Sequence, residues 1–318
     1  MRSIVEQTYP AHEIIVVFDG SPAEVVQAVR REFPGVICIE QDNFGRSVAK
    51  NTGAYAATGD WLCFLDDDDL WHREKLARTR EYIIANPDCR ALRNPIWFFA
   101  EEDNGPKSGF GFHRDFVALN LRECHIAAER LKTTSNDFSH LNIEGESFRK
   151  MVSRNHGIMS STVIRRELFF RAGAFQPFNS HADDWMMFAN AARISEWHLL
   201  PELLGFTRLH GGQATANTPE GAVHILSTLV DFWHGGRPLP HAALPPEIKR
   251  ELEACGPSYR LEVQGYFWRT LLSGRFSDAL KVHLLGSLLL PRLRDRVYSN
   301  IPPQITWRIK HYFLRGNK

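Results

Sequence analysis

Trp61-Leu62-Cys63-Phe64-Leu65-Asp66-Asp67-Asp68-Asp69-Leu70-Trp71 is the stretch that decides the fold class of this chain. An apolar segment suited to a buried strand ends in four consecutive carboxylates. Side chains two residues apart in an extended segment point the same way, so Asp66 and Asp68 can face one site. Mg²⁺ and similar cations are held by one or two carboxylates together with substrate phosphates. The run therefore predicts a divalent cation site; the alternative is a solvated acidic turn in which Asp69 caps the next helix.

Strands and helices alternate around this stretch. Glu13 to Phe18 is a continuous, β-branched apolar run that ends at Asp19-Gly20-Ser21, which is typical of a buried strand followed by a turn. The other expected elements are helices over 21–33, 45–58 and 73–85 and strands over 35–39 and 61–65. This alternation predicts an α/β fold with a largely parallel sheet and helices on both faces. Ligands of such sheets gather beyond the carboxyl ends of strands, where Asp19 and Asp66 lie.

The rest of the chain is less regular. Residues 101–156 have no clean periodicity, so we expect an insertion of loops and short helices over the active site. A strand over 158–164 and a helix over 185–194 follow. Further helices are expected over 222–233, 247–255, 259–272 and 276–289, separated by Gly and Pro. They predict an α-helical appendage at the C-terminal end.

Composition and charge describe an ordinary soluble globular protein, with 43% hydrophobic and 24% charged residues in 318. Residues 259–318 hold eleven Lys and Arg against three Asp and Glu, so the rest of the chain carries −7 within a total of +1. The five cysteines have no metal-ligand or redox spacing, which favours reduced thiols in the cytosol. No signal peptide and no membrane-spanning apolar run are visible.

Seven motifs in order resemble the GT-A glycosyltransferases of the large inverting family 2, typical of bacterial polysaccharide synthesis. The resemblance runs from about Ser3 to about Thr215. The motifs are Gln7-Thr8-Tyr9-Pro10, Glu13 to Ser21, Asn43 to Gly53, the acidic run, Ser160 to Arg166, Asp183-Asp184-Trp185 and Arg208 to Gly212. The resemblance implies a GT-A fold, which is a Rossmann-like mixed sheet with helices on both faces.

The same resemblance implies a domain plan. A GT-A catalytic domain would cover residues 1–217, and the C-terminal helical region would cover 218–318. Within the catalytic domain, residues 1–100 would form the nucleotide-binding half, 101–156 the insertion and 157–217 the acceptor half.

The resemblance also assigns the donor site. The residues implied in nucleotide-sugar binding are Asp19, Asn43, Gly45, Arg46, Lys50, Asn51, Asp66, Asp67 and His210. Asp19 would hold the base or ribose, Asp66 the ribose side, and His210 would lie near the diphosphate. Asp68 would ligate Mn²⁺ or Mg²⁺, whereas Asp69 would be structural. Alternatives remain open, since Asp19-Gly20-Ser21 is also an ordinary turn, Lys50 could be solvated, and a lone histidine is usually structural.

The acidic pair Asp183 and Asp184 occupies the place of the family's general base. Asp184 is the preferred base because Trp185 follows it, and an apolar wall could raise its pKa. The alternative is that the pair only caps the helix that begins there. Arg165 and Arg166 could face the diphosphate or an anionic acceptor, or could be a solvated helix entry.

The basic C-terminal tail interleaves aromatic residues with arginines. A cationic amphipathic helix of this kind can lie on an anionic membrane, or it can pack against the catalytic domain. The expected partners are a nucleotide-sugar donor and a glycan or lipid-linked glycan acceptor, with peripheral membrane contact as a further option. No nucleic-acid recognition motif is present. The expected location is the cytoplasm, with the inner face of the plasma membrane as the membrane alternative.

One departure concerns the start of the chain. Family members open with a strand and a Pro-Thr-Tyr-Asn-like turn, whereas this sequence begins inside the following helix. Either the start is assigned too late or the chain is a degenerate member, and the intact motifs favour the first. Unpaired ladder groups would cost about 1–3 kcal/mol each when buried. We therefore expect the 318-residue form to be poorly stable or weakly active.

Three functions compete. The first is a metal-dependent inverting transferase that moves a sugar from a nucleoside diphosphate, most commonly UDP in this family, to a glycan or lipid-linked acceptor of cell-surface polysaccharide synthesis. The second is a catalytically weakened nucleotide-binding paralogue with a truncated N-terminus. The third is a sugar-phosphate nucleotidyltransferase, although the Gly-rich loop and basic residue that open such enzymes are absent here.

Overall fold

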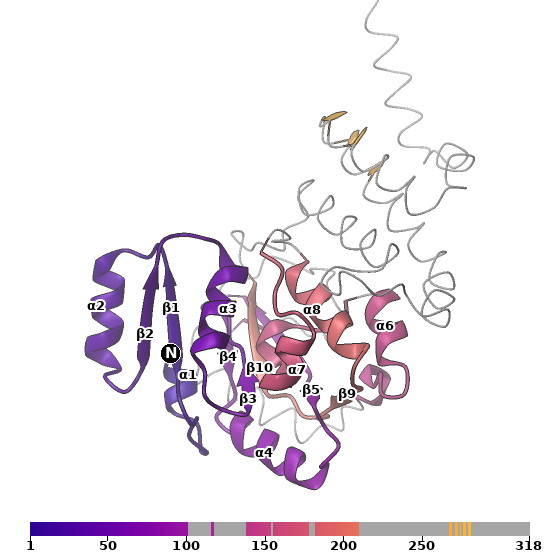
Figure 1. Ribbon diagram of the computed structural model, residues 1–318, viewed down its shortest axis with the longest axis horizontal. Coiled ribbons are helices and arrows are strands. Elements are labelled where there is room, and N and C mark those ends of the chain that lie inside the picture. The colour runs from indigo at the N-terminus through magenta and orange to yellow at the C-terminus, as the bar shows by residue number, and fades with distance from the viewer. Residues whose placement is uncertain are drawn as a thin grey trace, which may run out of the picture. The chain divides into compact units, whose positions relative to one another are not determined.

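The computed structural model describes residues 1–100, 116–117, 138–153, 155–177 and 182–209, and short helical pieces between 267 and 280 (Figure 1). The chain forms two compact units, Met1–Ala214 and Thr215–Lys318. Most of the expected insertion and the helices expected over 222–233 and 247–255 lie outside the described residues. The domain boundary at 217 and the helical appendage remain predictions.

The first part of the chain alternates as the apolar pattern predicts. Its elements are α1 (Arg2–Val5), β1 (Ile15–Asp19), α2 (Ala23–Glu32), β2 (Ile37–Gln41) and α3 (Arg46–Ala56). Strands β1 and β2 are parallel, with Asp19 opposite Gln41 at their carboxyl ends. Helix α3 lies close against β1, where a Cβ atom at Gly53 would be 3.4 Å from Val17. The Asp19 carboxylate at the end of β1 accepts from the Gly45 amide, so this strand end lies beside the first turn of α3.

The remaining strands form two mixed sheets. One has the order β3 (Trp61–Cys63), β8 (Val163–Arg165), β5 (Ala91–Arg93) and β9 (Trp197–Leu199). The other has the order β4 (Leu70–Trp71), β10 (Gly205–Leu209), β6 (Ile96–Ala100) and β7 (Phe116–Val117). The expected largely parallel sheet is wrong in this respect, because β8 pairs antiparallel with both β3 and β5. Within the described ranges β3 has no ladder to β1.

Helices cover these sheets. They are α4 (Lys75–Ala85), α6 (Ser147–Ser153), α7 (Arg166–Arg171) and α8 (Asp183–Ala192), with short 3-10 turns η1 (Ser139–Leu141) and η2 (Met159–Ser161). The strand expected over 158–164 is confirmed only in its last part, where β8 begins at Val163. Its first part is wrong, because residues 159–161 form the 3-10 turn η2. The hydroxyls of Ser161 and Thr162 both donate to the Ile158 carbonyl, at 2.8 and 3.0 Å, and turn the chain before β8 begins.

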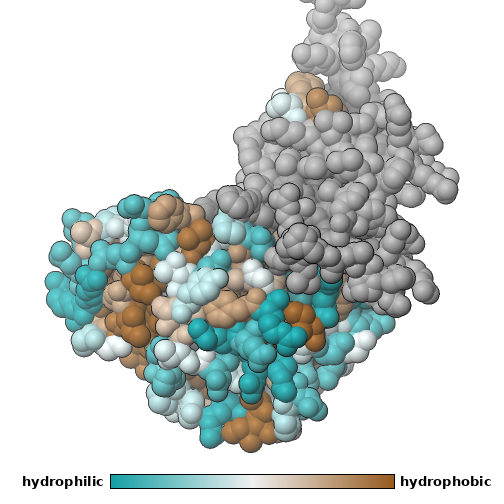
Figure 2. All heavy atoms as spheres, viewed as in Figure 1, coloured by the Kyte–Doolittle hydropathy of each residue, from teal (hydrophilic) through white to brown (hydrophobic). Residues whose placement is uncertain are grey.

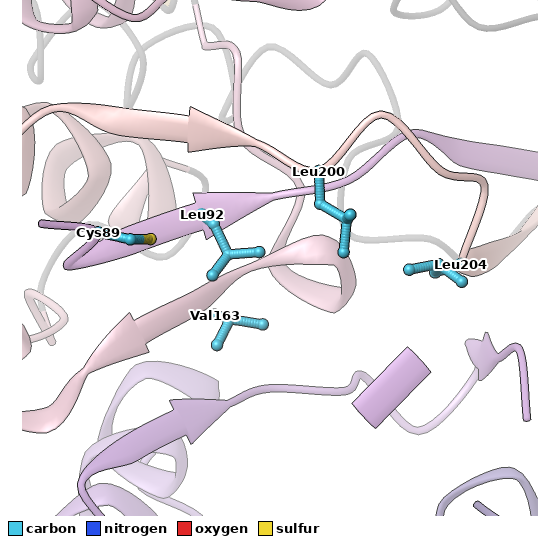
Figure 3. Packing of buried hydrophobic residues seen from close by; sticks show 5 residues of the cluster. All are labelled: Cys89, Leu92, Val163, Leu200 and Leu204. Carbon is cyan, nitrogen blue, oxygen red and sulfur yellow. The ribbon is translucent and has the colours of Figure 1, made fainter. Parts of the chain in front are cut away.

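A buried apolar cluster joins the strands of the β3–β8–β5–β9 sheet to the chain that follows β9. Its members are Cys89, Leu92, Val163, Leu200 and Leu204 (Figure 3). All five are less than 5% exposed, and they come from three segments of the chain, at residues 89–92, 163 and 200–204. This packing holds the strand ends that carry the acidic residues at defined positions.

Polar and apolar side chains are mixed on the visible surface of the described part (Figure 2). Large apolar side chains that remain exposed include Phe44 at 63% and Tyr55 at 67%. None of the helices in the described segments is long and apolar enough to cross a bilayer.

Candidate active site

The acidic run forms a tight loop between β3 and β4, and we call residues 66–69 the acidic loop. Its ends are joined by a hydrogen bond from the Asp69 amide to the Asp66 carbonyl, at 3.1 Å. The Ser160 hydroxyl lies between them, because it accepts from the Asp66 amide at 3.2 Å and donates to the Asp69 carboxylate at 2.5 Å. The turn η2 therefore holds both ends of the acidic loop through the Ser160 hydroxyl.

Asp69 is the buried member of the acidic loop, with 5% of its surface exposed. Its carboxylate also accepts from the Thr207 hydroxyl at 3.1 Å and the Arg208 amide at 3.2 Å. Burial raises its pKa to about 7, although the hydrogen bond from Ser160 works in the opposite direction. The helix-cap alternative for Asp69 is wrong, because α4 begins only at Lys75. Asp69 instead fastens the loop to β10.

Lys50 reaches the acidic loop from α3. Its ammonium lies 2.7 Å from the Asp66 carboxylate, and the two side chains are 20% and 38% exposed. Burial opposes the charge of Lys50, but the carboxylates of Asp66, Asp183 and Asp184 outweigh it and raise its pKa. Lys50 is therefore paired with a carboxylate rather than solvated.

Asp19 organises the loop that precedes α3. Its carboxylate accepts from the Gln41 amide group and from the backbone N–H groups of Phe44 and Gly45, each at 2.8 Å. Gly45, at φ +90°, precedes the first residue of α3. A carboxylate has about four acceptor positions, so Asp19 retains little capacity for a ligand. Its ligand-binding role stays a prediction, and the contacts in the structure are those of a residue that shapes a loop.

The acidic pair Asp183 and Asp184 begins α8, and its two members have different surroundings. Asp183 is 2% exposed and accepts from the Ser47 hydroxyl at 2.7 Å and from the Arg46 guanidinium at 3.2 Å. Asp184 is only partly buried, and its carboxylate accepts from the Trp185 amide at 2.6 Å. The two carboxylates thus have different partners: Asp183 is held by side chains of α3, whereas the hydrogen bond to Asp184 comes from the adjacent backbone.

The pKa of Asp184 is raised to about 6. Burial is the main cause and the charge of Asp183 adds to it, whereas Lys50, the Trp185 amide and Arg46 work in the opposite direction. A carboxyl with a pKa near 6 is ionised at neutral pH and is still basic enough to accept a proton. Two adjacent carboxylates in unlike environments are the usual arrangement when one of them does acid–base work.

Further predicted site residues include Asn51, the pair Arg165 and Arg166, and His210. The Asn51 side chain pairs with the backbone of Phe175, donating to its carbonyl at 2.8 Å and accepting from its amide at 3.0 Å. Arg165 lies 5.5 Å from the Trp61 ring and Arg166 lies 5.1 Å from the Phe170 ring. His210 lies outside the described residues. Asn51 therefore holds α3 to the segment before α8, and donor contact by it stays a prediction.

The acidic loop is the part of the site that could hold a cation. Asp67 is exposed, and Asp66 and Asp68 are partly exposed. No three His, Cys, Asp or Glu side chains in the described part of the chain converge as a ready metal cage. Mg²⁺ and Mn²⁺ in phosphate-transfer sites take one or two protein carboxylates and fill the remaining positions with phosphate oxygens and water. The carboxylates present fit that kind of ion.

Sequence reasoning missed several residues that shape this site. Ser47 binds Asp183, and Ser160 binds the acidic loop. Lys75 is fully buried and binds the Ser161 carbonyl of η2. Ser47 and Ser160 stand inside motifs that were recognised as wholes, so only their contacts reveal what their hydroxyls do. Lys75 carried no signal that could have been used, since it stands in the charged run His72-Arg73-Glu74-Lys75, where a lysine is ordinarily exposed.

The family model described as Glycosyl transferase family 2 matches residues 1–169. A Haemophilus influenzae protein described as an uncharacterized glycosyltransferase is 35% identical over 95 residues, which are 30% of this chain and 32% of that protein. The amylovoran biosynthesis glycosyltransferase AmsB of Erwinia amylovora is 36% identical over 86 residues, covering 24% of this chain and 28% of its own. The chain thus spans about a third or less of the length of these relatives.

Solved structures with the same fold cover nearly the whole chain. The mannosyltransferase PcManGT from Pyrobaculum calidifontis, solved with GDP-Man and Mn²⁺, has a TM-score of 0.53 at 18% identity over 94% of this chain and 82% of its own. TarS 1-349 of S. aureus has a TM-score of 0.52 at 13% identity over 93% of this chain and 87% of its own. At these identities the likeness concerns the fold alone, and the fold is GT-A, as the motifs predicted.

Proposed function

Because this chain belongs to glycosyl transferase family 2, we propose that it moves a sugar from a nucleoside diphosphate to a glycan or lipid-linked glycan acceptor. The anomeric carbon is inverted, and the donor is a UDP-sugar in the first instance. The single observation that carries this proposal is the difference between the surroundings of the two acidic side chains. Asp183 is fixed by Ser47 and Arg46, while Asp184 is partly exposed and has a pKa of about 6.

In this proposal Asp184 is the general base. Its carboxylate takes the proton of the acceptor hydroxyl, whose oxygen attacks the anomeric carbon from the face opposite the diphosphate. The bond from that carbon to the diphosphate oxygen breaks, and the nucleoside diphosphate leaves. Asp183 holds the first turn of α3 against α8 through Ser47 and Arg46, which sets the direction in which Asp184 points.

The donor would lie along the first turn of α3 and the acidic loop. Arg46 and Lys50 bring two cations to that turn, and the backbone dipole of a helix N-terminus also favours phosphate. Asp68, with Asp66 beside it, would hold Mn²⁺ or Mg²⁺, which when bound neutralises the charge that develops on the leaving diphosphate. Asn43 and the loop that Asp19 shapes would contact the base or ribose.

The acceptor and the location are part of the same proposal. AmsB is described as an amylovoran biosynthesis enzyme and TuaG of Bacillus subtilis as a putative teichuronic acid biosynthesis enzyme, which supports a polysaccharide acceptor. We propose action in the cytoplasm, with the basic residues of 259–318 in contact with the inner face of the membrane that carries a lipid-linked acceptor.

Thermal denaturation with UDP, with and without Mn²⁺, tests the donor site on the wild type and on Asp68→Asn. A ligand at a hundredfold its dissociation constant stabilises by about 2.7 kcal/mol, which raises the midpoint by several degrees. The expected shift needs Mn²⁺ and disappears in Asp68→Asn. The proposal fails if neither UDP nor GDP shifts the wild type.

Product analysis then tests the reaction itself. Release of nucleoside diphosphate from a sugar nucleotide supports glycosyl transfer, and release of pyrophosphate identifies a nucleotidyltransferase. Asp184→Asn should lower turnover by about a hundredfold or more, the usual contribution of a general base. If Asp184→Asn changes no turnover, the chain binds nucleotide without this chemistry.

A further inference from the structure

Lys75 is a fully buried lysine at the first residue of α4. Its ammonium donates to the Asn94 side-chain oxygen and, at 3.2 Å, to the Ser161 carbonyl. It also lies 5.6 Å from the centre of the Trp71 ring. These contacts come from three separate segments: the bend between β5 and β6, the turn η2, and β4.

This position is unfavourable for a cation. The N-terminal end of a helix carries partial positive charge, and burial opposes ionisation here because no carboxylate of the described residues pairs with Lys75. Burial accordingly lowers the pKa of Lys75 to about 8. The hydrogen bonds to Asn94 and Ser161 offset this cost.

The Lys75 contacts lead directly to the acidic loop. Ser161, whose carbonyl accepts from Lys75, follows Ser160 in η2, and the Ser160 carbonyl accepts from the Trp71 indole at 2.7 Å. The Ser160 hydroxyl in turn binds both ends of the acidic loop, the Asp66 amide and the Asp69 carboxylate. Trp71 and Lys75 thus bind two consecutive carbonyls of η2, those of Ser160 and Ser161. The hydroxyl of Ser160 binds the acidic loop.

We infer that Lys75 is a positioning residue that sets the conformation of the acidic loop through η2. It touches neither donor nor acceptor, and it acts by fixing where the Ser160 hydroxyl lies. An effect of Lys75 on catalysis rests on the proposed function, since the position of the acidic loop affects the reaction only if this loop binds the donor diphosphate and its cation.

Hydrogen exchange of the ligand-free chain tests this inference without any ligand. Lys75→Met removes the ammonium, Ser160→Ala removes the hydroxyl, and Thr79→Val is the matched control. Thr79 lies one turn further along α4, is 4% exposed, and its hydroxyl has no hydrogen-bond partner among the described residues. Lys75→Met and Ser160→Ala should each speed exchange in the peptide covering residues 64–71 by about tenfold or more, because each removes two hydrogen bonds. Thr79→Val should leave it unchanged.

A double variant separates positioning from general loss of stability. If Lys75 acts through Ser160, Lys75→Met combined with Ser160→Ala exchanges no faster at 64–71 than Ser160→Ala alone. The inference would be overturned if the two substitutions multiplied each other's effect on exchange in the double variant. It would also be overturned if Lys75→Met raised exchange equally throughout the unit 1–214. If Lys75→Met does not fold, Asn94→Ala decides, because it removes the other anchor of the ammonium and should produce the same local rise at smaller size.

Binding of UDP with Mn²⁺ to the same variants separates this inference from the proposed function. Affinity should fall about tenfold in Lys75→Met and Ser160→Ala and stay at the wild-type value in Thr79→Val. If exchange responds as expected but the wild type binds no nucleoside diphosphate, the proposed function fails and the positioning role stands. If the wild type binds and exchange at 64–71 is unchanged in Lys75→Met, the positioning role fails alone.

Discussion

Replacing Asp184 by Asn should stabilise the fold while it removes the proposed base. Burial and the neighbouring charge of Asp183 raise the pKa of Asp184 from 3.8 to about 6. The folded state therefore holds the Asp184 proton more tightly than the unfolded state does. An acid with a raised pKa costs stability as pH rises between its unfolded and folded pKa values, and that cost remains at all higher pH. An amide carries no such cost.

The magnitude follows from the two pKa values. Each unit of difference corresponds to about 1.4 kcal/mol, so the full cost above the folded pKa is about 3 kcal/mol. About pH 4.5 lies only a little above the unfolded pKa of 3.8 and well below the folded pKa of about 6, so the cost there is about 1 kcal/mol. The stability gained by Asp184→Asn should therefore be about 2 kcal/mol larger at about pH 7.5 than at about pH 4.5.

Urea unfolding of the ligand-free chain at these two pH values measures the difference. The control is Asp183→Asn, which replaces one of the two carboxylate oxygens that accept from Ser47 and Arg46 by an NH₂ group and should destabilise the fold by about 1–3 kcal/mol at about pH 7.5. An equal effect of Asp184→Asn at the two pH values would refute the reasoning, because it would mean that Asp184 titrates alike in the folded and unfolded chain.

Two further predictions concern α3 and the loop before it. Lys50→Met removes a charge that lowers the pKa of Asp184, so the acidic limb of the pH profile of kcat/KM should move to higher pH; a move to lower pH would contradict the electrostatics. Gly20→Ala should destabilise by about 2 kcal/mol or more, because φ is +73° and a Cβ there would lie 2.8 Å from that of Asn43. Gly45→Ala, at φ +90° with nothing within 4 Å, should cost only the backbone strain of about 1 kcal/mol. Urea midpoints compare these two, and equal costs would mean that the approach of Asn43 to Gly20 is unimportant.

The elements of the first hundred residues were predictable because their signals are local. A β-branched apolar run produces β1, although only Phe18 of that strand is fully buried, and small residues allow α3 to lie against it. Helix α4 stops at the Asn86-Pro87 breaker, as the sequence indicates. Neighbouring residues decide such features, so no knowledge of the rest of the chain is required.

The strand pairings could not be predicted in the same way. Strand β8 joins β3 to β5 across about a hundred residues of sequence, and β10 lies between β4 and β6. Such pairings depend on which faces can be buried together, and a segment's own pattern carries little information about its partner. The strand β8 also begins later than the apolar pattern predicted, because two hydroxyls bind the Ile158 carbonyl in the turn η2 that precedes it.

By itself the sequence determined the alternating α/β plan, the place of the acidic run at a strand end and the residue types available to the site. Only the tertiary structure decided how those residues differ from one another. Asp183 and Asp184 are chemically identical neighbours, and Asp66 to Asp69 are four identical side chains. Their burial and their partners come from α3, η2 and β10, which lie far away in the sequence, and the pKa values of Asp69 and Asp184 are raised as a result. The physical reason is that ionisation depends on the local dielectric and on nearby charges, which exist only once distant segments have packed together.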